Sequence, residues 1–95
     1  MFWGLFVGSR GAPNRIRIIS VLRNMPRNRN QLSIELNLDY KNIQHHLKVL
    51  EKNNLVIKTG NYYGVVYCVS PLFENNEIVF DEIVYRLKNR VIKFG

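Results

Sequence analysis

The stretch from Asp39 to Asn53 reads Asp-Tyr-Lys-Asn-Ile-Gln-His-His-Leu-Lys-Val-Leu-Glu-Lys-Asn. Its leucines and isoleucine recur at the spacing that places them on one face of an α-helix, at Ile43, Leu47 and Leu50. Asp39 suits the N-cap, because its carboxylate can accept from the unpaired amides of the first turn. The opposite face carries amides and positive charge, the groups that contact base edges and phosphates: Lys41, Asn42, Gln44, His45, Lys48 and Lys52. Taken alone, the same face also fits a merely solvated helix.

The charge of the chain favours a polyanionic partner. Ninety-five residues are enough for one domain with one core, and the formal net charge is +7, with an isoelectric point near 9.9. Residues 1–70 contain ten basic and three acidic residues, whereas residues 71–95 contain four of each. All of the excess charge therefore lies in the part of the chain that contains the helix from Asp39 to Asn53.

The other segments predict an α+β, mainly helical domain. An amphipathic helix is expected from Asn14 to Met25, with Ile18, Ile19, Leu22 and Met25 on its stripe and Pro26 at its end. A short helix should run from Gln31 to Asn37, capped by Asn30, with Leu32 and Leu36 on its buried side. Asn37 suits the positive φ that a tight turn between two helices often needs. A hairpin over residues 55–70, bounded by Gly60 and Gly64 and closed by Pro71, and a long helix over residues 76–94 complete the order.

This order is that of a winged helix-turn-helix: a three-helix core, a β-hairpin wing and a long C-terminal helix. The residues also resemble the archaeal branch of the ArsR-like winged-helix transcription regulators over roughly residues 8–70. The likeness is carried by Arg10-Gly11 and Asn14–Ile19, Asn30-Gln31-Leu32, Leu36–Lys41, His45–Glu51, Asn54-Leu55-Val56, and Gly60, Tyr63, Gly64 and Tyr67. The family's usual turn glycine is Asn37 here, which the tolerance of Asn for positive φ accommodates.

The resemblance implies a dimeric regulator that binds double-stranded DNA and inserts its third helix in the major groove. Its groove-facing positions would be Tyr40, Lys41, Asn42, Gln44, His45 and Lys48. Wing residues Lys58, Asn61 and Tyr62 would approach the DNA backbone or the minor groove. The basic residues Arg15, Arg27 and Arg29 are expected to bind phosphates.

The two ends of the chain carry more apolar residues than one small core can use. The N-terminal arm, residues 1–8, is expected to be a strand or a packing arm, and residues 76–94 a dimerisation helix. We therefore predict a homodimer interface formed by Phe2, Trp3, Leu5, Phe6, Phe80, Ile83, Val84, Leu87 and Val91. Beyond that stripe, the last helix has further apolar residues at Ile78, Val79, Tyr85 and Ile92. The alternative is that arm and helix pack only on their own domain.

No enzymatic activity, cofactor or metal site is expected. The chain lacks a nucleophile with a supporting base and a glycine-rich phosphate loop, as well as the cysteine pair or acidic and histidine ligands of the family's metal sensors. His46 is expected to be a partly buried structural residue, and His45 to face DNA. Cys68, the single cysteine, reads as an apolar filler rather than a redox thiol, and suits the reducing cytoplasm. The opening residues are too few to span a membrane, and no membrane partner is expected.

Two other functions compete with DNA binding. A winged helix can serve as a protein-interaction module in a larger transcription or membrane-associated assembly. RNA binding is the third possibility, disfavoured because the aromatic platform of single-strand readers is missing. Duplex binding that weakens steeply with salt favours DNA binding over the interaction module, whereas a dimer or complex that forms without DNA affinity favours the module.

Overall fold

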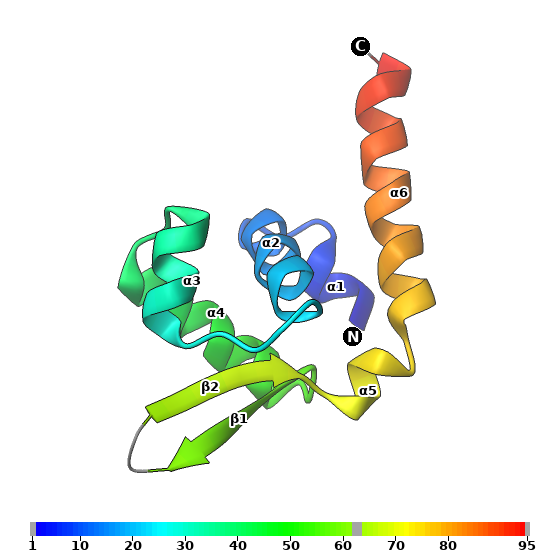
Figure 1. Ribbon diagram of the computed structural model, residues 1–95. Helices are drawn as coiled ribbons and strands as arrows, with labels where there is room; N and C mark the ends of the chain where they lie inside the picture. Colours follow the sequence, from blue (N-terminus) through cyan, green and yellow to red (C-terminus); the bar gives the residue numbers. More distant parts are fainter. Residues whose placement is uncertain (1, 62–63, 95) are drawn as a thin grey trace.

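The computed structural model describes residues 2–61 and 64–94, and the side chains of residues 4–61 and 64–89. Six helices and a two-stranded antiparallel hairpin follow one another in these residues, and the predicted winged helix-turn-helix is confirmed (Figure 1). None of these helices is both long and apolar enough to cross a membrane. The elements are α1 (Phe2–Phe6), α2 (Ala12–Leu22), α3 (Arg29–Leu36), α4 (Tyr40–Lys52), β1 (Val56–Asn61), β2 (Gly64–Val69), α5 (Pro71–Glu74) and α6 (Glu77–Phe94).

The core forms where α4 meets α2 and α3. The apolar stripe predicted for α4 is completely or almost completely buried, and so are Ile18, Ile19 and Leu22 of α2. The prediction for Met25 was wrong, because α2 ends at Leu22 and Met25 is 58% exposed. The chain leaves the helix early because Arg27 pairs with Tyr67 of β2 through two backbone hydrogen bonds of 3.1 and 2.8 Å.

The turn between α3 and α4 follows the predicted backbone. Asn37 has φ 53° and ends α3 in the left-handed conformation, as expected. The start of α3 was predicted wrongly, because the cap is Asn28 rather than Asn30. The Asn28 carboxamide accepts from the Gln31 amide at 2.7 Å, and the Asn28 amide donates to the Gln31 side chain at 2.8 Å. Asp39 holds the N-cap position of α4 but makes no capping hydrogen bond with its side chain.

The wing is a short antiparallel ladder that pairs Val56 with Val69 at its base and Asn61 with Gly64 at its far end. At Gly60, with φ 148°, a Cβ would come 2.1 Å from the Gly64 carbonyl oxygen, so only glycine fits there. Val56 and Tyr67 are buried and fix the base of the hairpin to the core. Tyr62, predicted to contact DNA, lies outside the described residues.

A short helix that the sequence analysis did not predict follows the wing. Pro71 does not simply close the hairpin; it begins α5, whose N-cap is Ser70. The Ser70 hydroxyl accepts from the Phe73 amide at 3.1 Å and directs Phe73 into the core. There Phe73 meets Phe80 of α6 edge to face, with ring centroids 5.3 Å apart. The last helix is thereby held on the domain.

Both ends of the chain pack on the domain. The arm is the helix α1 rather than a strand, and Phe6 lies edge to face against Phe80 at 5.2 Å. Three residues predicted for the dimer interface, Phe6, Phe80 and Ile83, are buried within the chain's own core, where they have no surface left to offer a partner. Half-buried Leu5, Val84 and Leu87 pack against the same core. The side chains of Phe2, Trp3 and Val91 lie outside the described part.

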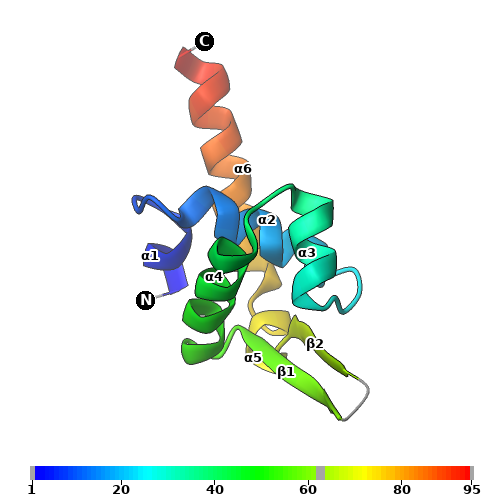
Figure 2. The same cartoon turned by 90° about the vertical axis from the view of Figure 1, so that its left-hand side faces the viewer.

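The far end of α6 stands clear of the body in two perpendicular views (Figures 1 and 2). Its near end is tied to α2 by Arg23, which bonds Glu77 at 2.6 Å and Asp81 at 2.7 Å. The same guanidinium lies over the Phe73 and Phe80 rings, 5.9 and 5.5 Å from their centroids. Arg23 therefore joins the end of α2 to the two elements that follow the wing.

We predict that Arg23→Met lowers the free energy of unfolding by about 1–2 kcal/mol at neutral pH, since it removes two partly exposed ion pairs and two cation–π contacts. The hydrogen bond from Arg23 lowers the pKa of the Asp81 carboxyl in the fold. The stabilisation that the Arg23–Asp81 contact gives the fold is therefore complete above the ordinary pKa of 3.8 and is lost as the pH falls below that value. Urea unfolding at pH 7 and pH 3 should show the difference from wild type shrinking in acid.

The matched control is Arg86→Met, because Arg86 makes an exposed pair with Glu82 within α6 alone. That change should cost no more than a few tenths of a kcal/mol, about the value of an exposed pair one helical turn apart. An Arg23→Met loss of the same size at both pH values would show that stacking on the rings, not the carboxylates, carries the effect.

Candidate nucleic-acid interface

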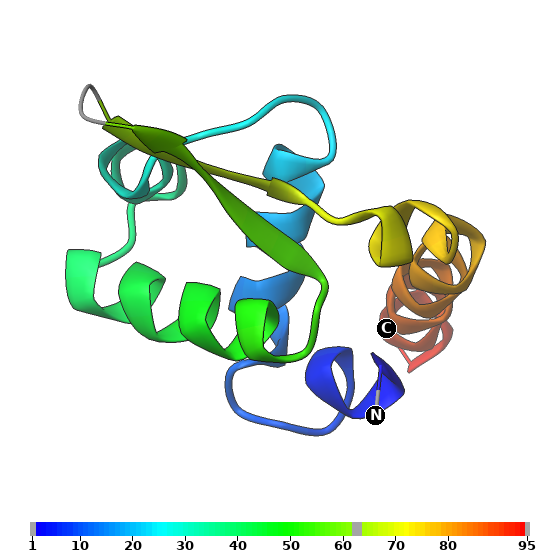
Figure 3. The same ribbon diagram turned by 90° about the horizontal axis from the view of Figure 1, so that it is seen from below.

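The outer face of α4 is the largest gathering of predicted DNA-binding residues. Burial of Ile43, Leu47 and Leu50 turns the other side of the helix outward. Six of its residues are exposed, and Gln44 is half-buried at the edge of the same face. Figure 3 shows α4 along one side of the molecule, with the hairpin next to it. The exposed residues are Tyr40, Lys41, Asn42, His45, Lys48 and Lys52.

The wing adds a second basic element beside α4. Lys58 and Asn61, both predicted to contact DNA, are exposed on β1. Residues 57–61 are exposed along the whole strand, while Val56 at its start is buried. This arrangement leaves the hairpin free to lie against a polymer that also meets α4.

The three arginines predicted to bind phosphates are held by their own chain to different degrees. Arg27 donates from Nε to Glu35 at 2.7 Å and from Nη1 to the Met25 carbonyl at 2.7 Å. The Arg29 guanidinium lies 5.5 Å from the centroid of the Tyr40 ring, at the start of the exposed face of α4. Arg15 is held by hydrogen bonds to Leu5 and Ser9.

Arg15 lies at the edge of a polar hollow of about 460 Å³ between the start of α2 and α4, which we call the polar pocket. Its Nη1 donates to the Leu5 carbonyl at 2.9 Å and to the Ser9 hydroxyl at 3.0 Å. The contribution of Ser9, Arg10, Gly11 and Asn14 was not predicted from sequence, because only the fold brings these residues to α4. The described lining is Ser9, Arg10, Gly11, Asn14, Arg15, Asn42, His45 and His46.

The two histidines differ in exposure, as predicted. His45 is exposed, whereas His46 is 4% exposed, and their rings lie 5.4 Å apart. Burial is the main cause that lowers the pKa of His46 below its ordinary value, and the positive charges of Arg15 and His45 lower it further. His46 is therefore neutral at neutral pH, in a basic setting.

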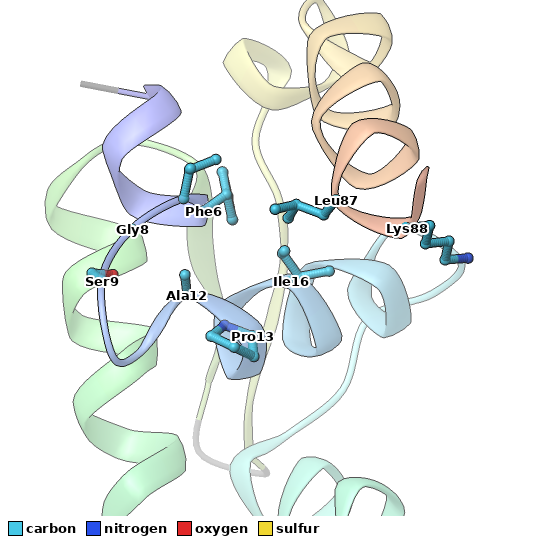
Figure 4. A pocket seen from close by; sticks show the side chains of 9 residues that line it. Phe6, Gly8, Ser9, Ala12, Pro13, Ile16, Leu87 and Lys88 are labelled. Carbon is cyan, nitrogen blue, oxygen red and sulfur yellow. The ribbon is translucent and has the colours of Figure 1, made fainter. Parts of the chain in front are cut away.

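A second hollow, of about 630 Å³, lies between the turn that joins α1 to α2 and the middle of α6 (Figure 4). We call it the apolar pocket, because Phe6, Val7, Ala12, Pro13, Ile16 and Leu87 supply most of its wall, along with Gly8, Ser9 and Lys88. Figure 4 shows Leu87 on α6 opposite Ile16 of α2 and Phe6 of α1. Ser9 lines both pockets.

The described residues also include one cysteine and several possible metal ligands. Cys68 is half-buried on β2, opposite Ile57. It is therefore more exposed than the buried apolar filler that was predicted from sequence. Among the described residues, no three His, Cys, Asp or Glu side chains come together as a metal site.

Comparison with known proteins finds a family model that matches part of this chain. Residues 12–58 match the model of the bacterial regulatory proteins of the arsR family. We call these residues the ArsR-type segment. The ArsR-type segment runs from the start of α2 into β1 and so includes the whole outer face of α4. No curated protein matches the chain by sequence.

Solved structures confirm the fold around the ArsR-type segment. A probable transcriptional regulator from Pseudomonas aeruginosa superposes with a TM-score of 0.78 at 15% identity, over 98% of this chain and 73% of that one. Diamide-treated YodB from B. subtilis gives 0.69 at 18% identity, over 93% and 87%. The adhesin competence repressor AdcR from Streptococcus pyogenes gives 0.59 at 14% identity, over 85% of this chain and 65% of AdcR. The ArsR-type segment and this fold together support DNA-binding transcription regulation.

The ion pair between Arg27 and Glu35 leads to a prediction about DNA affinity. Glu35→Gln should free Arg27 to reach a phosphate, and so steepen the logarithmic salt dependence of duplex binding by about one unit. A fluorescence-anisotropy titration of one duplex at several salt concentrations measures this slope. Glu74→Gln, which removes the same charge on α5, should leave the slope as in wild type. An unchanged slope for Glu35→Gln would show that Arg27 does not reach DNA even when it is released.

Proposed function

We propose that the protein binds specific duplex sequences as a homodimer and reads the major groove with α4. The observation that carries this proposal is the outer face of α4, where exposed amide and basic side chains stand opposite a completely buried stripe. An α-helix fits the major groove, where each base pair presents its own pattern of donors and acceptors. No acidic residue stands among the exposed ones of this face, so its charge attracts the duplex.

Roles within this interface follow from the chemistry of each side chain. Asn42 and Gln44 have amides that can donate to and accept from an adenine at once. Lys41, His45 and Lys48 would contact guanines or neighbouring phosphates, and Tyr40 would lie at the edge of the groove. From the wing, Lys58 and Asn61 would contact the DNA backbone, with Tyr62 as a further contact proposed from sequence alone. Arg15, Arg27 and Arg29 would contribute charge beside α4.

We further propose that residues 1–95 act as one DNA-binding domain whose last helix dimerises. Since the inner face of α6 is used by its own domain, the contact surface would be the outer one. Ile78 and Tyr85 lie two turns apart on α6 and are 84% and 63% exposed; Val79 and Leu72 beside them are exposed too. The half-buried Leu5, Val84 and Leu87 would form the rim. A two-fold axis here would set two α4 helices about one DNA turn apart.

Other parts of the proposal rest on sequence. The assignment to the archaeal branch depends on the residues of α3, α4 and the wing quoted above. A cytoplasmic location suits a regulator that has one cysteine and a duplex DNA partner. We propose no enzymatic activity, since both the family model and the structural neighbours are regulators rather than enzymes.

Base reading and phosphate binding can be separated by two substitutions. Gln44→Ala should cost roughly 1–3 kcal/mol on the preferred site and little on random duplex, because it removes a base contact. Lys58→Ala should weaken both alike and lower the salt slope by about one unit, because one fewer counterion is released. Selection from random duplexes supplies the preferred site, and anisotropy titrations at several salt concentrations measure both quantities. Equal weakening of both duplexes by Gln44→Ala would contradict the reading role of α4.

The proposed dimer surface can be tested without disturbing the core. Tyr85→Asp should shift sedimentation at tens of micromolar from dimer toward monomer, since a buried charge is costly in an apolar interface. Ile34→Asp is the matched control, because Ile34 is similarly exposed on α3, far from α6 (Figure 1), and should leave the dimer intact. A wild-type monomer that does not bind duplex DNA would favour the protein-interaction module instead.

A further inference from the structure

The polar pocket has the features of an anion site. We propose that it binds a phosphate-type oxyanion between Arg15 and His46, at the start of α2, and that the ligand is a phosphate of the DNA backbone. The proposal deepens the one above by naming a contact that no base-reading residue makes. It rests on four features of the pocket.

The first feature is the close packing of two side chains against Gly11. A Cβ at this position would lie 2.8 Å from Nη2 of Arg15 and 2.8 Å from Cε1 of His46, so any side chain would push both groups away from the start of α2. Gly11 has φ −83° and ψ −5°, which every residue adopts easily. The glycine is thus not needed for the backbone here. Its effect is to keep the guanidinium and the imidazole close to the bare start of α2.

The second feature is a pair of buried polar atoms without partners. Nε of Arg15 and Nδ1 of His46 are buried and make no hydrogen bond within the described residues. An unpaired buried polar group costs about 1–3 kcal/mol, so such groups normally have a partner. An oxyanion in the pocket would accept from both nitrogens. The Arg15 bonds to Leu5 and Ser9 already hold the guanidinium in place for this role.

The third feature is the positive end of α2. This helix has 11 residues, and its N-cap, Gly11, has no side chain. Pro13 has no amide hydrogen and the Ala12 amide donates to the Ser9 carbonyl at 3.2 Å, so within the first turn only the Asn14 amide is left for a ligand. Such helix starts attract anions through their amides and the helix dipole. The fourth feature is charge, since none of the described residues that line the pocket is acidic, while Arg10 and Arg15 bring positive charge.

The position of the pocket identifies the source of the phosphate. Asn42 and His45 belong to the exposed face of α4 and also line the pocket, so it opens beside the helix proposed to enter the groove. A backbone phosphate along that groove could reach it. Free inorganic phosphate has the same chemistry and is the competing source.

Occupation of the pocket should be linked to proton uptake. Burial, Arg15 and His45 hold the pKa of His46 down, and Arg10 adds positive charge from the turn before α2. A bound oxyanion offsets these charges and raises the pKa of His46. By reciprocity, the oxyanion binds more tightly as the pH falls toward the range in which His46 takes up its proton.

The test uses the full chain and inorganic phosphate as the probe. Nuclear magnetic resonance of the His46 ring should show saturable shifts with phosphate, stronger at pH 6 than at pH 8. Gly11→Ala should weaken this binding at least tenfold, because the methyl group pushes Arg15 and His46 away from the start of α2. Gly4→Ala is the matched control, since its Cβ meets nothing within 4 Å, and it should bind as wild type. His46→Gln keeps a neutral donor and, followed on the backbone amides that line the pocket, should retain only the pH dependence that comes from the ionisation of phosphate itself; thermal melts verify that each variant is folded.

Duplex titrations then separate the two sources. If Gly11→Ala weakens binding to all duplexes alike and lowers the salt slope by about one unit, a DNA phosphate occupies the pocket. Saturable phosphate binding with unchanged duplex affinity would keep the oxyanion site and assign it to free phosphate, which overturns the DNA source. Shifts that do not saturate, or equal binding by Gly11→Ala, would overturn the site itself. Because the phosphate titration needs no DNA, it decides the site even if α4 proves not to read bases.

Discussion

The burial of one face of α4 is the constraint on which the rest of the structure depends. Turning this helix outward would expose Ile43, Leu47 and Leu50, at roughly 1.5–3 kcal/mol for each side chain. The core therefore fixes which residues face solvent, and the amides and lysines of α4 have one orientation. His46 belongs to the buried side and His45 to the open one, which is why two adjacent histidines have different properties.

Polar contacts made by three arginines attach other elements to this core. Arg17 donates to the Leu36 carbonyl at 2.6 Å and so ties the end of α3 to α2. The backbone pairing of Arg27 with Tyr67 joins the loop before α3 to the wing. Arg23 joins the end of α2 to α6 through its ion pairs with Glu77 and Asp81. Arg17 and Arg23 hold the framework with their charged side chains, and the side chain of Arg27 is paired with Glu35, so a count of basic residues overstates the charge that is free to meet DNA.

Periodicity predicted the helices well because it depends only on a helix's own residues. The stripe of α4 was predictable in this way, and the positive φ of Asn37 was predictable from the residue type at a tight turn. Burial between distant segments was not, so the sequence could not place Phe6 against Phe80 or bring Gly11 to His46. Two local signals were overlooked. Asn28 with Gln31 three residues later is a capping-box spacing, and Ser70-Pro71 is a usual helix start.

The turn between α1 and α2 lies between α6, which is proposed to dimerise, and the polar pocket beside α4. Phe6 packs on Phe80 of α6, and its neighbour Leu5 accepts the hydrogen bond that positions Arg15. Ser9 also bonds Arg15 and lines both the apolar pocket beside α6 and the polar pocket beside α4. A shift of α6 against α1 would therefore move the Arg15 guanidinium relative to the outer face of α4. Because coupling travels through contacts with alternative arrangements, this turn is where we expect dimer geometry to influence DNA binding.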